Sequence, residues 1–153
     1  MRNTLGMAFL LAAGLSFCGS ARADGPVKVF ILAGQSNMEG KGSVEIGHGG
    51  VTGAIGSLRY MVNTDPANYG LLVDGSANWV VRNDVWIWST TNTNNTVEKG
   101  DLTVGYGSNA SFGPELGFGT VLGNLYDDQV LLIKTAWGGK SLAVDFRPPS
   151  SGG

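Results

Sequence analysis

The sequence predicts an α/β domain built on a parallel β-sheet, and three observations lead to this fold class. Two short, nearly continuous apolar runs at 27–33 and 129–134 are typical of strands buried on both faces, as in a parallel sheet. A segment with helix-start signals begins at 113 and ends directly before the second run, which gives the order of a βαβ unit. Glycine accounts for 25 of the 153 residues, which indicates many tight turns.

Composition and charge exclude several classes of protein. Hydrophobic residues make up 42% of the chain and charged residues 14%, so it is not a disordered polyelectrolyte. The many glycines exclude a long helical bundle, because glycine disfavours helix interiors. A net charge of −2 offers no basic surface for nucleic acid. One cysteine excludes a disulfide framework or a cysteine zinc cluster, and one histidine leaves little material for a metal site.

Residues 1–23 have the pattern of a cleaved signal peptide. A basic start is followed by an apolar stretch at 5–15 and by an Ala-x-Ala cleavage site at 21–23. The apolar stretch is shorter than the roughly 20 residues that span a bilayer. We therefore expect a mature protein that begins at Asp24, is secreted or periplasmic, and has no membrane contact after cleavage. The alternative, a lipoprotein attached through Cys18, is disfavoured by the bulky residue before that cysteine.

The middle of the chain predicts loops around one further strand. Residues 40–57 are glycine-rich and without periodicity, which indicates a loop. The aromatic and β-branched stretch at 80–88 predicts a strand, with Trp86 and Trp88 on one strand face and packed in the core. Serine, threonine and asparagine dominate the next residues, so 89–112 is expected to form a long loop of the kind that is often functional.

The helix before the second apolar run has clear boundaries. Pro114 suits the first helical position, Glu115 complements the positive end of the helix dipole, and the aspartates at 127–128 end the helix. Stabilisation of this helix end is a sufficient structural role for Glu115, beside a role in substrate binding. The chain closes on loop residues at 146–153, so we expect the sheet to be incomplete at the C-terminus.

A serine directly after the first strand is the first candidate for chemistry. Gly34-Gln35-Ser36-Asn37 follows the apolar run, and ligands of open α/β sheets bind outside the carboxyl ends of the strands. Gly34 permits a sharp exit from the strand, and backbone N–H groups near Ser36 can face a developing oxyanion.

Three segments of the mature chain resemble one enzyme family. The sequence FILAGQSNM at 30–38 resembles the first conserved block of the SGNH hydrolases, most closely the sialate O-acetylesterase-like carbohydrate esterases. KTAWGGKS at 134–141 is similar to the second block, and FGPELG at 112–117 is similar to a segment common in this group. The resemblance implies that 24–153 is the N-terminal part of a three-layer α/β/α, flavodoxin-like domain.

The resemblance also implies roles for individual residues. Ser36 would be the nucleophile and Gly139 would donate a backbone N–H to the oxyanion hole, with Gly138 as the fallback donor. The residues expected to contact the acetylated carbohydrate are Gln35, Asn37, Trp137 and Glu115. Such an esterase needs no metal and no organic cofactor. The expected reaction is removal of O-acetyl groups from sialate or plant-glycan esters.

The sequence departs from the family pattern in its catalytic base. The Asp-x-x-His pair of the last family block does not occur, and the single histidine, His48, lies three residues after Glu45 in the glycine-rich loop. We expect His48 to be a solvated loop residue. The base and its orienting carboxylate are therefore expected beyond Gly153, and the chain of 153 residues is expected to be inactive by itself.

Two other functions compete with the esterase. A non-catalytic exported protein could bind carbohydrate through its tryptophans and the 89–112 segment. A phosphate-binding loop is suggested by Gly139-Lys140-Ser141, but Lys134 stands where that motif requires its first glycine.

Overall fold

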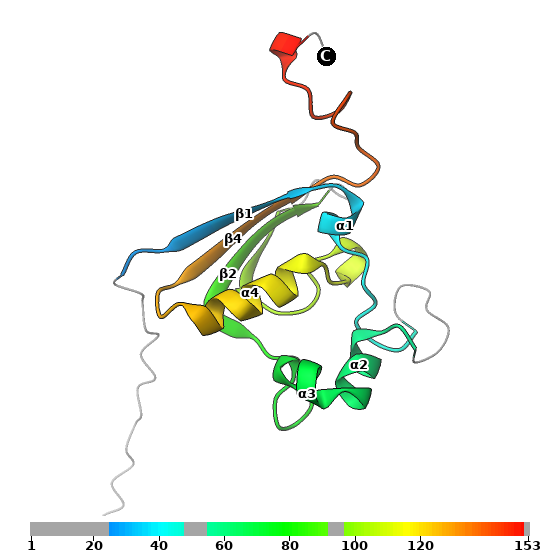
Figure 1. Cartoon of the computed structure of the whole chain (residues 1–153), viewed down its shortest axis with the longest axis vertical. Coiled ribbons are helices and arrows are strands. Elements are labelled where there is room, and N and C mark those ends of the chain that lie inside the picture. Colours follow the sequence, from blue (N-terminus) through cyan, green and yellow to red (C-terminus); the bar gives the residue numbers. More distant parts are fainter. Residues whose placement is uncertain (1–24, 48–54, 92–96, 152–153) are drawn as a thin grey trace, which may run out of the picture.

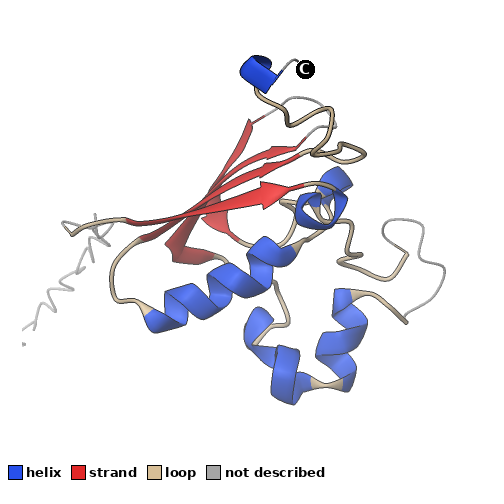
Figure 2. Cartoon of the chain, turned by 45° about the horizontal axis from the view of Figure 1, so that its top comes forward, coloured by secondary structure: helices blue, strands red, loops and turns tan. Residues whose placement is uncertain are grey.

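The computed structural model describes residues 25–47, 55–91 and 97–151, which form one β-sheet with helices against one of its faces (Figures 1 and 2). The strands are β1 (Lys28–Gly34), β2 (Arg82–Thr91), β3 (Val97–Leu102) and β4 (Val130–Ala136). The helices are α1 (Ser36–Glu39), α2 (Leu58–Thr64), α3 (Pro66–Tyr69) and α4 (Pro114–Leu125), with short 3-10 turns η2 (Gly70–Leu72), η3 (Ser108–Ala110) and η4 (Pro149–Ser151). No described helix has the length and apolar character to cross a membrane.

The sheet has the strand order β1-β4-β2-β3. β4 lies parallel to β1 on one side and to β2 on the other, whereas β3 pairs antiparallel with β2. The carboxyl ends of the three parallel strands coincide, because Ala136 is the register partner of both Gly34 and Thr91. Segments that leave these strands therefore start at the same edge of the sheet.

The hydrophobic core lies between the sheet and α4. Alternate residues of the strands point to this side, and the alternation is clearest in β4, where every second residue is buried. The buried cluster consists of Leu32, Val85, Ile87, Leu102, Leu122, Val130 and Leu132. The helix lies close to the sheet at Gly119, where an added Cβ would come within 2.3 Å of Leu102 Cδ2. Glycine at this position thus permits the close contact between α4 and the strands.

The opposite face of the sheet carries no helix among the described residues (Figure 2). This uncovered face is formed by Val29, Ile31, Trp86, Trp88, Leu131 and Ile133, which are exposed or half-buried. Ile31 is 72% exposed and Trp88 is 49% exposed. The expectation that the first strand is buried on both faces was therefore wrong, as was the expectation that the two strand tryptophans pack in the core.

The predicted elements were confirmed in four places and corrected in two. Strands occur at both apolar runs and within 80–88, and α4 begins and ends where its signals predicted. The expected long loop at 89–112 was wrong, because β2 extends to Thr91 and β3 occupies Val97–Leu102. Antiparallel β3 also makes the sheet mixed rather than purely parallel. The fold class remains α/β.

Candidate active site

The carboxyl ends of β1 and β4 bring two predicted motifs together. The Trp137 backbone N–H, directly after β4, donates a hydrogen bond of 3.0 Å to the Gly34 carbonyl at the end of β1. Ser36 follows Gly34 by two residues, and the glycine pair follows Trp137 directly. Parallel pairing of adjacent strands therefore places the serine segment and the glycine segment side by side at one edge of the sheet.

Ser36 is the first residue of α1 and is half-buried at this edge. Its neighbour Gln35 caps the helix: the Gln35 Oε1 atom accepts hydrogen bonds from the Ser36 backbone N–H at 3.1 Å and from the Ser36 hydroxyl at 2.9 Å. Gln35 and Asn37 are both exposed beside the serine. The hydroxyl and the backbone N–H of Ser36 thus share one polar partner that solvent can reach.

The two glycines after β4 differ in backbone conformation and in surroundings. Gly139 has a φ of +73° with open space where a side chain would lie, so its requirement is conformational. Gly138 has no positive φ, but an added Cβ would come within 2.3 Å of Glu39 Oε2. The turn therefore packs against the side chain of Glu39, the last residue of α1, which is buried.

A buried ion pair lies beneath the two segments. Lys134 of β4 and Glu115 of α4 have fully buried side chains, and the Lys134 Nζ atom lies 2.7 Å from Glu115 Oε2. The same ammonium donates to the carbonyls of Glu39 at 2.9 Å and Tyr106 at 2.8 Å. The other oxygen of Glu115 accepts the Gly113 backbone N–H at 2.8 Å.

This pair corrects the expectation that Glu115 contacts substrate. The carboxylate is fully buried, and both of its oxygens are bound to groups of the protein. It stabilises the beginning of α4, which is the structural role that its place in the first turn also indicated.

Trp137 lies at the surface next to the glycine pair and is 43% exposed. The Lys140 ammonium lies 5.0 Å from the centre of its indole ring, and Phe146 meets the ring edge-to-face at a centroid distance of 6.4 Å. Lys140 also pairs with Asp145 at 2.9 Å. The pKa of the Asp145 carboxyl is lowered, mainly by the hydrogen bond from the Ser141 backbone N–H and next by the hydrogen bond from the Lys140 ammonium. These contacts order the segment after β4 around the tryptophan.

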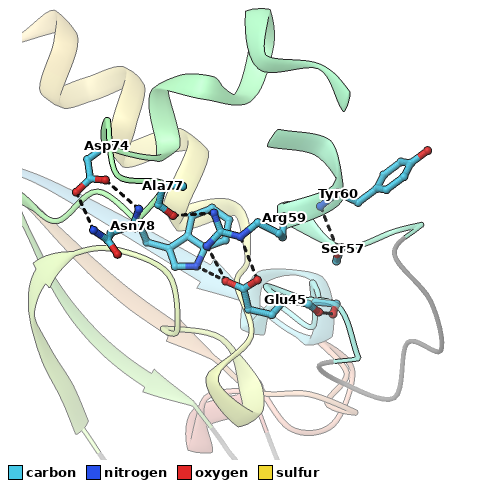
Figure 3. Close-up of polar contacts among 9 residues, drawn as sticks. Glu45, Ser57, Arg59, Tyr60, Asp74, Ala77 and Asn78 are labelled. Atoms are coloured by element: carbon cyan, nitrogen blue, oxygen red, sulfur yellow. Dashed lines mark hydrogen bonds and ion pairs between the residues drawn. The ribbon is translucent and has the colours of Figure 1, made fainter. Parts of the chain in front are cut away.

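The other tryptophans have different surroundings from those of Trp137. Trp86 and Trp88 belong to the uncovered face of the sheet, away from α4. The Trp79 indole N–H donates to Glu45 at 2.8 Å, and the Arg59 guanidinium lies 4.1 Å from the centre of the indole ring. Arg59 also pairs with the Glu45 carboxylate (Figure 3). This cluster connects the predicted 40–57 loop to α2 and to the turn before β2.

The sequence analysis also discussed His48 and Lys140, and the structure describes only Lys140. His48 lies outside the described residues, as does the predicted signal peptide. Lys140 does not belong to a phosphate-binding loop: in the described part of the chain, no α-helix follows β4 to receive the phosphate, and the lysine pairs with Asp145.

Lys134 and Glu39 were not identified as site residues from the sequence, although one signal was present. In β4 the buried positions alternate through Val130, Leu132, Lys134 and Ala136, so a lysine occupies a core-facing position. Such a lysine requires a buried partner, but only the fold shows that the partner is Glu115.

Comparison with known proteins identifies a family for the chain. The family model described as carbohydrate esterase, sialic acid-specific acetylesterase, matches residues 26–151. No curated protein and no solved structure matches the chain. The matched range contains the serine segment, the start of α4 and the glycine pair. The chain therefore belongs to the carbohydrate esterase family of sialic acid-specific acetylesterases.

Proposed function

We propose that Ser36 is the nucleophile of a serine esterase that removes O-acetyl groups from carbohydrate. The observation that carries the proposal is the hydrogen bond from Trp137 N–H to the Gly34 carbonyl, which joins the serine segment to the glycine turn at the carboxyl ends of two parallel strands. This is the edge at which ligands of α/β sheets bind. The family match independently supports esterase chemistry.

The proposed reaction proceeds through an acyl-enzyme. The Ser36 oxygen attacks the acetyl carbonyl carbon, its proton passes to a general base, and the carbonyl oxygen becomes an oxyanion. The Ser36 and Gly139 backbone N–H groups stabilise that oxyanion, which requires the Gln35 oxygen to move away from the Ser36 N–H. The sugar oxygen takes the proton from the base and leaves as the alcohol. Water then attacks the acetyl carbon, acetate is released, and the proton from water returns through the base to the Ser36 oxygen.

The hydrogen bond that the Ser36 hydroxyl makes in the described part of the chain does not supply a general base. The Ser36 hydroxyl donates to the amide oxygen of Gln35, and an amide oxygen is a poor base. We propose that a histidine and an aspartate encoded after Gly153 supply the base and its orienting carboxylate. The same proposal includes the completed three-layer α/β/α domain and export through cleavage before Asp24.

The experiment compares the 153-residue chain with a form extended through the downstream coding sequence, each with and without Ser36→Ala. Acetate release is measured from p-nitrophenyl acetate and from an O-acetylated sialic acid. We expect the extended form to hydrolyse both in a Ser36-dependent manner, and the shorter chain not to exceed its alanine control. Full activity in the extended alanine variant would remove Ser36 as the nucleophile, and Ser36-dependent turnover by the shorter chain would place the base within it.

A further inference from the structure

The helix that carries Ser36 is too short to maintain its own position. α1 contains four residues, and its backbone bonds run from Glu39 N–H to the Gln35 carbonyl at 2.8 Å and from Gly40 N–H to the Ser36 carbonyl at 3.1 Å. A single helical turn is unstable in isolation, because nucleation fixes several residues for very few hydrogen bonds. The position of Ser36 must therefore be set by contacts between this segment and the rest of the protein.

The Ser108 backbone N–H binds the Gly40 carbonyl at the end of α1 at 2.9 Å, and two further contacts come from β4 and the residue after it, one on each side of the serine. Before Ser36, the Gly34 carbonyl accepts the Trp137 backbone N–H at 3.0 Å. After Ser36, the Glu39 carbonyl accepts the Lys134 ammonium at 2.9 Å. β4 continues through Trp137 into the glycine pair, so β4 and the residue after it bind both ends of the nucleophile segment and lead into the proposed oxyanion turn.

We propose that Lys134 is a positioning residue for the esterase reaction, binding the end of α1 so that Ser36 stays in register with the Gly138–Gly139 turn. This inference rests on the proposed function. A lysine ammonium has three protons, and here all three have acceptors: the Glu39 carbonyl, the Tyr106 carbonyl and the Glu115 carboxylate. The three bonds fix the ammonium in direction as well as in place.

Stability alone does not account for a charged pair at this position. A buried ion pair replaced by apolar residues of similar volume commonly leaves stability unchanged or improves it. An apolar side chain at 134 could fill the core but could not bind the carbonyl at the end of α1. Glu115 neutralises the ammonium and so makes this directional contact possible inside the core.

The test uses the double substitution Lys134→Met with Glu115→Gln. It leaves no unpaired buried charge, and the glutamine oxygen can still accept the Gly113 backbone N–H. Leu102→Ala is the matched control, because it destabilises the core at the opposite end of the sheet, where Leu102 pairs with the first residue of β2. Each variant is made in the 153-residue chain and in the form extended through the downstream coding sequence.

In the extended form we expect the double variant to lose about 10²-fold in kcat with little change in KM, since small displacements of a reacting group cost rates of this order. Leu102→Ala should lower the melting temperature but retain kcat per folded molecule. Wild-type kcat in the double variant, measured well below its melting temperature, would overturn the positioning role. Absence of Ser36-dependent hydrolysis in the unmodified extended form would instead refute the proposed function.

A second measurement on the 153-residue chain does not depend on activity. Amide hydrogen exchange of Glu39 and Gly40 reports the two backbone bonds of α1 directly. We expect the double variant to lose protection at these two amides while the β1–β4 ladder keeps its own, and Leu102→Ala to show no selective loss there. Equal protection of both amides in the double variant and the control would show that Lys134 does not hold the helix.

Discussion

Substitution of Gly139 by valine separates the conformational role of this residue from its proposed chemical role. An L-residue forced into the left-handed region costs roughly 1–2 kcal/mol, and a β-branched residue costs more. Gly139 has a φ of +73°, and no neighbouring atom lies within 4 Å of an added Cβ. A side chain at this position would therefore strain the backbone without clashing with the rest of the protein. We expect valine to destabilise the fold by about 2 kcal/mol.

The effect on catalysis should be larger than the effect on stability. Loss of one oxyanion donor costs about 2.7–4 kcal/mol in the transition state, or about 10²–10³ in kcat. Steady-state kinetics of the extended form on an acetylated sugar should therefore show at least this fall, with a smaller change in KM. Gly139→Asn is the control, because asparagine tolerates positive φ and should keep more activity. Near-wild-type kcat in Gly139→Val would remove this N–H from the oxyanion hole and direct attention to Gly138.

Three further outcomes follow from contacts described above. Gly117→Ala should raise the melting temperature, because its position in α4 is open and alanine favours helix by about 1 kcal/mol over glycine. Gly119→Ala should lower the melting temperature by overpacking the core. The opposite order in thermal unfolding would contradict the described packing. The 153-residue chain should bind a hydrophobic dye through the uncovered face, and Ile31→Lys should reduce the fluorescence; equal fluorescence would place the dye elsewhere. The pKa of Asp145 is lowered first by the Ser141 backbone N–H, so the contact persists above about pH 4 and is lost as the pH falls below that. As the pH falls below about 4, tryptophan fluorescence should accordingly change more in the parent than in Asp145→Asn.

The elements that the sequence predicted correctly are those with strong local signals. The apolar runs that became β1 and β4 and the proline at the start of α4 act through neighbouring residues, so one sequence suffices to identify them. The position of Ser36 followed because it depends only on where β1 ends.

The missed features depend on contacts between distant segments. β3 has the sequence VEKGDL, which lacks the β-branched and aromatic pattern of a strand and forms through its pairing with β2. The exposure of Trp86 and Trp88 depends on which sheet face the helices cover. The ion pair of Lys134 with Glu115 joins a strand to a helix, and spacing in the sequence does not reveal it.

The strand order β1-β4-β2-β3 also has a consequence for how the protein is made. β2 and β3 can pair as a local hairpin, but β1 has no described strand neighbour except β4, which follows it by about a hundred residues and makes this pairing slow to form. β4 must therefore insert between a waiting β1 and an already paired β2. During synthesis on the ribosome, the serine segment emerges early yet acquires its neighbouring turn only when β4 is in place.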